Sequence, residues 1–424
     1  MRSSIIAALV LSAAAVAQKA APPTPKSVTV PITIDHNRLV IDVDLPLPDG
    51  STARIRAWVD NGNPDLSVSR RVATLLGLNV TCGDRECSAA PPPELRIGGM
   101  KIALTALKEV KIPLRPVNAA AVMASGMNAE INIPSTILRS YDVLVDFPGH
   151  EFSIGPPGSL KFKGVPSKMQ VGAVTGLIQI PARIENNKNK NKNYNLALDL
   201  GASISFLADD LFDSLASAHP DWPHMTGGVG PANLWGSQGE VTSKVIRIDR
   251  LQFASLFLTS VPMVRFSPPA KDYFEKRAGV PTAGLLGAEA LQNYRIGLDY
   301  AHSIAYFEIG RLFNFPDFDV IGVVLRPEDD GRFTILGIAG YEGKPSVPAG
   351  ERGVQAGDQL VAVDGIPVAG STMGQVWSML GGLPGKQRIL TLQRAGAQFK
   401  VAATVQHFLA EKEEDDAKEK SGKN

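Results

Sequence analysis

Apolar and polar residues alternate along much of the chain, and many of the apolar ones are β-branched. Residues 28–34 read Val-Thr-Val-Pro-Ile-Thr-Ile, and residues 39–45 read Leu-Val-Ile-Asp-Val-Asp-Leu. A period of two residues is typical of strands that bury one face. Turn sequences such as Pro48-Asp49-Gly50 separate these segments. The pattern therefore predicts a mainly β chain of many short strands.

The β pattern occurs twice. One apolar strand runs into Asp60-Asn61-Gly62-Asn63, and a second runs into Asp199-Leu200-Gly201-Ala202. A helix-like stretch follows each of them. Further along, residues 138–147 match residues 291–300, each with a tyrosine followed by a strand that ends in Asp-Phe or Asp-Tyr. Two ordered matches indicate a duplicated β unit, with a modest insertion in the second copy.

The N-terminal residues resemble an export signal. Arg2 provides a positive start, residues 5–16 are mostly apolar, and Ala15-Val16-Ala17 forms a cleavage signal. This stretch is shorter than the roughly 20 residues that span a bilayer. We therefore expect an exported bacterial protein, periplasmic or secreted, with no membrane span after cleavage; an uncleaved N-terminal anchor is the alternative.

Changes in composition divide the chain into six expected parts. These are a signal peptide at 1–17, a flexible leader at 18–27, a first lobe at 28–160, a second lobe at 161–315, a C-terminal module at 316–409 and a disordered charged tail at 410–424. The chain of 424 residues has a formal net charge of only +1. Such a balance provides no field that would attract nucleic acid, so no nucleic-acid partner is expected.

Cys82 and Cys87 are the only cysteines of the chain. In an exported protein, two cysteines at close spacing predict a local disulfide. Zinc is the alternative, but no histidine lies near enough in the sequence to complete four ligands. The bridge would shape a loop more than stabilise the domain, since it closes a short segment.

The two Asp-x-Gly turns carry the candidate chemistry. If the two copies pack about a two-fold axis, the carboxyl groups of Asp60 and Asp199 come within a few ångströms. Two carboxyls so close share one proton, and their pKa values separate. The ionised member can then activate a water molecule, while the protonated member donates to the carbonyl oxygen under attack. Gly62 and Gly201 would permit the sharp turn and the close approach of backbone N–H groups.

At these residues the chain resembles the pepsin and retropepsin superfamily of aspartic peptidases. The resemblance spans residues 28–311 and includes an apolar-apolar-Gly segment, Leu285-Leu286-Gly287, ahead of the strand ending in Asp299-Tyr300. It implies a two-lobed acid-protease β fold, a polypeptide substrate, a catalytic pair formed by Asp60 and Asp199, and no cofactor or metal.

The chain departs from that family at the residue after each aspartate. The family has Thr or Ser there, which makes buried hydrogen bonds between the two turns. Asn61 could substitute for it, but the side chain of Leu200 cannot form hydrogen bonds. In the first lobe, Asn132-Ile133-Pro134 stands where the second has its apolar-apolar-Gly segment. An inactive descendant that only binds peptides therefore stays open as an alternative.

The resemblance also implies a β-hairpin flap over the substrate. The glycine-rich segment 227–239 lies where the second lobe would carry it, and Leu234, Trp235 and Gly236 are its candidate substrate contacts. An ordinary hairpin with one half-buried tryptophan is the alternative. Other chemistries find no support, because the six histidines form no metal-binding pattern and Ser203 has no evident base.

Residues 353–368 resemble the signature of a bacterial PDZ domain, an α+β module in which Ala-Gly-Asp leads to a strand and an Asp-Gly hairpin. Residues 373–380 would form its groove helix. PDZ domains bind peptides by adding a strand to a sheet edge. The resemblance assigns the peptide-binding loop to Ile321, Gly322 and Val323, with a peptide or protein ligand as partner. A module that only braces the neighbouring lobe is the alternative.

Together these features predict an exported aspartic endopeptidase that uses water activated by Asp60 and Asp199, with a PDZ module for substrate recruitment. The alternative function is a catalytically weak or inactive peptide-binding scaffold.

Overall fold

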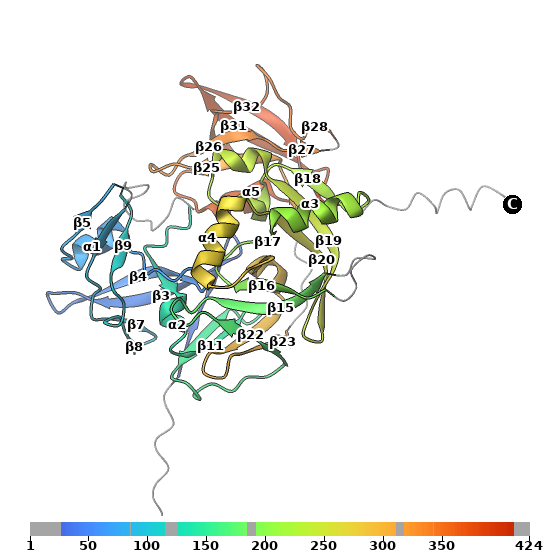
Figure 1. Cartoon of the computed structure of the whole chain (residues 1–424). Helices are drawn as coiled ribbons and strands as arrows, with labels where there is room; N and C mark the ends of the chain where they lie inside the picture. Colours follow the sequence, from blue (N-terminus) through green and yellow to red (C-terminus); the bar gives the residue numbers. More distant parts are fainter. Residues whose placement is uncertain are drawn as a thin grey trace, which may run out of the picture.

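The computed structural model describes residues 27–84, 86–114, 126–184, 192–310, 318–341 and 343–410. The expected signal peptide, nearly all of the leader and all but the first residue of the charged tail lie outside these ranges. Figure 1 shows three regions, with the first lobe in blue to teal, the second in green to yellow, and the C-terminal module in orange to red.

The first lobe is a six-stranded sheet in the order β10-β4-β3-β7-β8, with β2 paired to β3, and a small three-stranded sheet flanks it. Its strands and helices are β1 (Val28–Pro31), β2 (Thr33–Asp35), β3 (Arg38–Pro46), β4 (Thr52–Asp60), α1 (Arg70–Leu75), β5 (Thr81–Cys82), β6 (Cys87–Ala89), β7 (Glu94–Ile97), β8 (Met100–Ala103), β9 (Val110–Ile112), β10 (Ile131–Pro134), α2 (Ser135–Leu138), β11 (Asp142–Asp146) and β12 (Glu151–Gly155). The turn predicted at Pro48-Asp49-Gly50 joins β3 to β4, and the Asp49 carboxylate accepts from Ser51 N at 2.9 Å.

The second lobe is built around a ten-stranded sheet. Its elements are β13 (Val165–Lys168), β14 (Gln170–Val171), β15 (Ile178–Ile184), β16 (Tyr194–Asp199), β17 (Ser205–Leu207), α3 (Asp209–Ala218), β18 (His224–Thr226), the 3-10 turns η1 (Gly230–Ala232) and η2 (Gln238–Thr242), β19 (Lys244–Phe253), β20 (Leu256–Arg265), α4 (Pro268–Ala278), β21 (Gly284–Gly287), η3 (Ala288–Leu291), β22 (Tyr294–Asp299) and β23 (Ile304–Ile309). Both helix-like stretches of the repeat are helical in the structure, as α1 and α3. The sequence did not predict α4.

A shared six-stranded sheet joins the two lobes. Its order is β1-β12-β11-β22-β23-β13, so each lobe contributes three strands. At its centre the equivalent strands β11 and β22 pair antiparallel, with Asp142 opposite Asp299 and Leu144 opposite Gly297. Antiparallel pairing of two equivalent strands is what a two-fold relation between the lobes produces. Asp146 and Asp299, at strand ends, accept backbone N–H groups of the turns that follow.

The C-terminal module is a six-stranded sheet with one helix. Its elements are β24 (Asp319–Val320), β25 (Val323–Pro327), β26 (Phe333–Ile338), β27 (Gly340–Tyr341), β28 (Lys344–Pro345), β29 (Gln359–Val363), β30 (Ile366–Pro367), α5 (Met373–Leu380), β31 (Gln387–Arg394), β32 (Ala397–Thr404) and β33 (Gln406–His407). Thr372 begins α5 with a capping box that includes Gln375.

The module and the second lobe share one hydrophobic core. Val229, Ala232 and Leu234 of the second lobe belong to the same buried cluster as Leu325 and Val376 of the module. In addition, β27 pairs with β18 and so extends the sheet of the second lobe. The module is therefore packed into the body of the protein.

Candidate active site

Asp60 and Asp199 occupy equivalent positions in the two lobes. Asp60 is the last residue of β4, and Asp199 is the last residue of β16. In each lobe a parallel strand ends beside the aspartate, with Pro134 of β10 opposite Asp60 and Gly287 of β21 opposite Asp199. The match between Asn132-Ile133-Pro134 and Leu285-Leu286-Gly287 that the sequence suggested is thus reproduced in strand register.

The glycines of the two turns bring the aspartates together. A Cβ atom added to Gly62 would lie 1.9 Å from Oδ2 of Asp199, and one added to Gly201 would lie 2.9 Å from Oδ1 of Asp60. Each glycine therefore packs against the aspartate of the opposite lobe. The backbone N–H of Gly62 hydrogen-bonds both carboxyl groups, which places the two acids beside a single donor.

Asn61 connects the turns through a pair of hydrogen bonds. Its Nδ2 donates to the carbonyl oxygen of Leu198 at 2.6 Å, and its Oδ1 accepts from Leu200 N at 2.7 Å. One carboxamide thus provides both the donor and the acceptor that the opposite backbone needs. Leu200 is buried and contributes packing only. Of the residues that follow the two aspartates, only Asn61 in the first lobe connects the turns through its side chain.

Burial dominates the electrostatics of the pair. Asp60 is 3% exposed and Asp199 is 6% exposed. Desolvation raises the pKa of Asp199 to about 6, against the stabilising N–H groups of Gly201 and Ala202. Desolvation and then the charge of Asp199 raise the pKa of Asp60 well above its ordinary value, against Arg38 and the side chain of Asn63. One carboxyl of the pair therefore ionises while the other keeps a proton, and the charge of Asp199 favours the protonated form of Asp60.

Arg38 is a charged neighbour of the pair that the sequence did not reveal. Its side chain is fully buried, and burial lowers its pKa to about 10. The guanidinium lies 4.5 Å from the ring centroid of Trp235 and 5.8 Å from that of Trp58, and Nη2 donates to Leu234 O at 2.9 Å. Its positive charge lowers the pKa of both aspartates. In sequence, Arg38 only opens an apolar strand, so nothing marked it.

The turn that precedes Arg38 contacts the other two regions. His36 and Asn37 adopt positive φ angles of 51° and 60°, as a two-residue hairpin turn requires. His36 Nε2 lies 2.8 Å from Gly230 O, and Asn37 Nδ2 donates to Ser203 O at 3.2 Å. Asp35 accepts from Gly374 N of α5 at 3.1 Å. The β2–β3 turn thus fixes the first lobe to the second lobe and to the module.

The segment with Leu234, Trp235 and Gly236 differs from the expected flap. It connects the paired strands β18 and β19, but 3-10 turns occupy its length where an extended hairpin was predicted. The carboxylate of Glu240 accepts backbone N–H groups from Leu234 and Trp235, each at 2.9 Å. The loop is therefore closed on its own acidic residue. Trp235 stays 39% exposed, with its ring centroid 6.2 Å from that of Trp58.

The peptide-binding edge predicted in the C-terminal module is covered by this same loop. Asn233 Nδ2 donates to Leu325 O at 3.0 Å, and Asn233 Oδ1 accepts from Leu325 N at 2.9 Å. The carboxamide therefore pairs with the edge strand β25 as an added strand would. Gly236 packs against Arg326 of the same strand.

The predicted peptide-binding loop also forms hydrogen bonds within the chain. Ile321, Gly322 and Val323 are all buried. Ile321 N donates to Leu380 O at 3.0 Å, and Val323 N donates to Ile321 O at 2.9 Å. These two N–H groups already have acceptors within the chain, so peptide binding at this loop stays a prediction.

Cys82 and Cys87 form a disulfide that closes the β5–β6 hairpin. Cys82 and Cys87 face each other in the register of this hairpin. The bridge thus lies in the small sheet of the first lobe, apart from the Asp-x-Gly turns.

Comparisons with known proteins identify the C-terminal module. Residues 341–394 match the PDZ domain family, so the expected mainly β chain with a C-terminal PDZ domain is confirmed. No curated protein matches the chain significantly. Within the described ranges, no helix has the length and apolar character needed to cross a bilayer.

Among solved structures, the chain is similar to the aspartic proteinase from Irpex lacteus, with a TM-score of 0.41 and 11% sequence identity. The match covers 67% of this chain and 98% of that one. Because this similarity is low, the function proposed below rests on the geometry of the two turns.

Proposed function

We propose that the protein is an aspartic endopeptidase whose catalytic groups are Asp60 and Asp199. The observation that supports this most directly is the meeting of two buried carboxyl groups beside one donor, Gly62 N. Burying two acids together is unfavourable unless one of them keeps a proton. A pair that shares one proton combines a general base with a general acid, which is what hydrolysis of an amide requires.

The pKa order assigns the roles. Asp199, with the lower pKa, accepts a proton from water while the water oxygen bonds to the peptide carbonyl carbon. Asp60 donates its proton to the carbonyl oxygen, which gives a neutral diol. When the C–N bond breaks, the proton on Asp199 passes to the leaving nitrogen, and a diol hydroxyl returns its proton to Asp60. The pair is thus restored, with one water consumed.

The pKa of Asp199, about 6, also sets the expected pH range. The working form has one ionised and one protonated carboxyl, so it forms as the pH rises through about 6. It is lost when Asp60 ionises at a higher pH. We therefore expect a bell-shaped profile of kcat/KM with its maximum near neutrality.

We further propose that the PDZ domain braces the loop over the site. Asn233 occupies the edge of β25, so recruitment of a peptide there would require the loop to leave. Binding of C-terminal peptides to the intact chain, measured by calorimetry, tests this. Tight binding to the wild type with no change in the loop would contradict the bracing role.

Export is proposed from the N-terminal residues alone, which lie outside the described ranges. N-terminal sequencing of the protein from the cell envelope and the medium would check it. A mature chain that begins at Gln18 is the expected result, and a retained Met1 would contradict it.

The test of catalysis is cleavage of an unfolded protein between pH 4 and pH 9. We expect cleavage by the wild type, and loss by at least a thousandfold on Asp60→Asn or Asp199→Asn, since each removes one half of the acid–base pair. Asp146→Asn is the matched control, because Asp146 also ends a strand but its carboxylate pairs with Gly149 N and Arg295 instead of with the dyad. Unchanged cleavage in both dyad variants would exclude the mechanism. A folded wild type that cleaves nothing would favour the scaffold alternative.

A further inference from the structure

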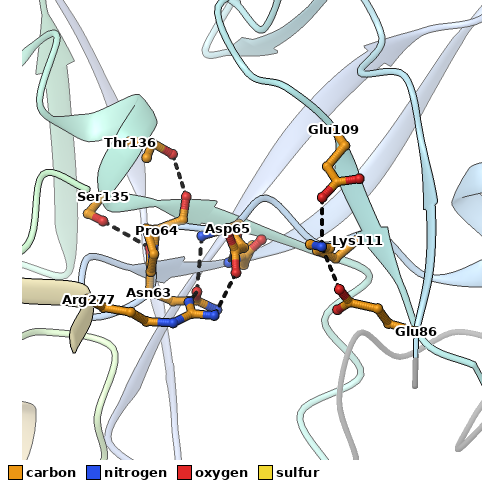
Figure 2. Close-up of polar contacts among 10 residues, drawn as sticks. Asn63, Pro64, Asp65, Glu86, Glu109, Lys111, Ser135, Thr136 and Arg277 are labelled. Atoms are coloured by element: carbon orange, nitrogen blue, oxygen red, sulfur yellow. Dashed lines mark hydrogen bonds and ion pairs between the residues drawn. The ribbon is translucent and has the colours of Figure 1, made fainter. Parts of the chain in front are cut away.

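Arg277 reaches from the second lobe to the turn that carries Asp60. It lies in the last turn of α4, and its Nη1 donates to Asn63 Oδ1 at 3.2 Å. Its Nη2 lies 2.9 Å from Oδ2 of Asp65. Figure 2 shows the guanidinium extending from its helix across to both of these side chains. The contact therefore joins one lobe to the catalytic turn of the other.

The contact determines which way the carboxamide of Asn63 points. Asn63 Oδ1 also accepts from Asp65 N at 3.0 Å, so two donors face this oxygen. A carboxamide presents its acceptor on one side and its donor on the other. With the oxygen occupied in this way, the NH2 group points to Asp60 and hydrogen-bonds its carboxyl group. A flipped amide would place the NH2 group against two other donors.

Other groups hold the backbone of the same turn. Asn63 O accepts from Ser135 N at 2.9 Å and from Ser135 Oγ at 3.0 Å, and Pro64 O accepts from Thr136 Oγ1 at 2.6 Å. Both partners belong to α2 of the first lobe, as Figure 2 shows. The main chain of the turn should therefore persist without Arg277, whereas the amide of Asn63 would lose one of its two fixed donors.

The surroundings of Arg277 suit a positioning role more than a stabilising one. Its side chain is 27% exposed and that of Asp65 is 38% exposed, and partly exposed pairs contribute little to stability. The guanidinium also lies 4.2 Å from the ring centroid of Tyr273, one helical turn earlier, which limits its orientation. Removing Arg277 should thus leave the protein folded.

We propose that Arg277 is a positioning residue that holds the Asn63 amide in the orientation that donates to Asp60. Its effect on catalysis rests on the peptidase function proposed above. The Asp199 turn has Ala202 in place of Asn63, so this device serves Asp60 alone. The hydrogen bond to the acid then depends on the second lobe being closed onto the first.

The test compares the wild type, Arg277→Met, Asn63→Ala and the double variant. For Arg277→Met we expect kcat/KM to fall about tenfold, as the loss of one oriented hydrogen bond predicts. The basic limb of the pH profile should move up by about one unit, because Asp60 loses a donor that lowers its pKa. In the Asn63→Ala background, Arg277→Met should have little further effect.

Arg265→Met is the matched control. Arg265 is an arginine of the same lobe that pairs with Asp213 at 2.7 Å, and its side chain is 30% exposed. It should leave both kcat/KM and the pH limb unchanged. Arg277→Lys keeps the charge but not the two-pronged geometry, so full recovery with lysine would show that charge alone matters and would overturn the proposal. Equal effects of Arg277→Met with and without Asn63 would also overturn it.

A second readout separates this inference from the proposed activity. Titration of the Asp60 carboxyl by carbon-13 NMR reports its ionisation whether or not the protein cleaves peptides. A higher pKa of Asp60 in Arg277→Met supports the positioning role even for an inactive wild type. An unchanged Asp60 titration rejects it even if the wild type is an active peptidase.

Discussion

The two Asp-x-Gly turns have the same backbone position but are supported in different ways. The Asp60 turn has polar side chains, since Asn61 connects it to the opposite turn and Asn63 donates to its carboxyl group. The Asp199 turn relies on backbone donors, Gly201 N at 2.8 Å and Ala202 N at 3.1 Å. Duplication thus produced equivalent strands, while the groups that tune each acid diverged. The two pKa values separate because burial raises both and the charge of Asp199 raises that of Asp60 further.

Apart from the aspartates themselves, the largest expected effect comes from the glycine that touches Asp199. Gly62→Ala would place a methyl group 1.9 Å from the position of Asp199 Oδ2, so the two turns must move apart. Displacement of a reacting group by about 1 Å can cost about a hundredfold in rate. We expect a loss of at least that size in kcat/KM. Gly201→Ala, whose methyl group would lie 2.9 Å from Asp60 Oδ1, should be milder, and the reverse order would contradict the packing described here.

The next effect tests the one-sided connection between the turns. Asn61→Ala leaves Leu198 O and Leu200 N buried without their partner. Unsatisfied buried groups each cost about 1–3 kcal/mol, so we expect the free energy of unfolding to fall by about 2–4 kcal/mol in urea denaturation. Leu200→Met conserves volume and should cost less than about 1.5 kcal/mol. Similar losses in both variants would mean that packing, not hydrogen bonding, joins the turns.

Stability should depend on pH through the buried acids. The pKa of Asp199 is about 6 in the folded protein, against 3.8 for an ordinary aspartate as in the unfolded chain. Its contribution to stability is therefore full below pH 3.8 and is lost as the pH rises through about 6. Asp199→Asn removes this loss. Its unfolding free energy should exceed that of the wild type at pH 7 by about 3 kcal/mol, and the two should converge near pH 4. For Asp60→Asn the gain should continue to grow at higher pH, because the pKa of Asp60 is raised further.

The smallest effect concerns the charge that both turns share. Arg38 lowers the pKa of both aspartates, so Arg38→Met should raise both values and move the acid limb of the activity profile up by about one unit. Arg38→Lys retains a positive charge and should move it less. A shift of only one limb in Arg38→Met would show that the guanidinium acts on one turn and not on the pair.

Sequence reasoning succeeded where the signal is local or repeated. The alternation of apolar residues predicted strands, and the capping pattern around Thr372 accompanies a helix found at the predicted residues, Met373–Leu380. The register of Pro134 and Gly287 beside the two aspartates follows from the repeat. Sequence reasoning failed at α4. This helix starts at Pro268-Pro269 and is only weakly amphipathic, so its sequence does not differ clearly from that of a loop.

The glycine-rich loop at 227–239 differs in shape from the predicted hairpin, and its role as a flap stays a prediction. Glycines indicated mobility, yet the loop folds onto Glu240 and onto the edge of β25. Glu240 directly follows the loop in sequence, but Leu325 is 92 residues away from Asn233. No local pattern reports an acceptor supplied from so far along the chain.

The sequence by itself determined the mainly β character, the duplication and the identity of the two aspartates, because periodicity and repeated motifs are written in neighbouring residues. Only the tertiary structure decided what surrounds those aspartates. Arg38, Asn61 and Arg277 act across lobe boundaries, and the PDZ edge is covered by a loop of the second lobe. Burial and the charges of distant residues set the pKa of a carboxyl group, and both arise only when separate segments pack together.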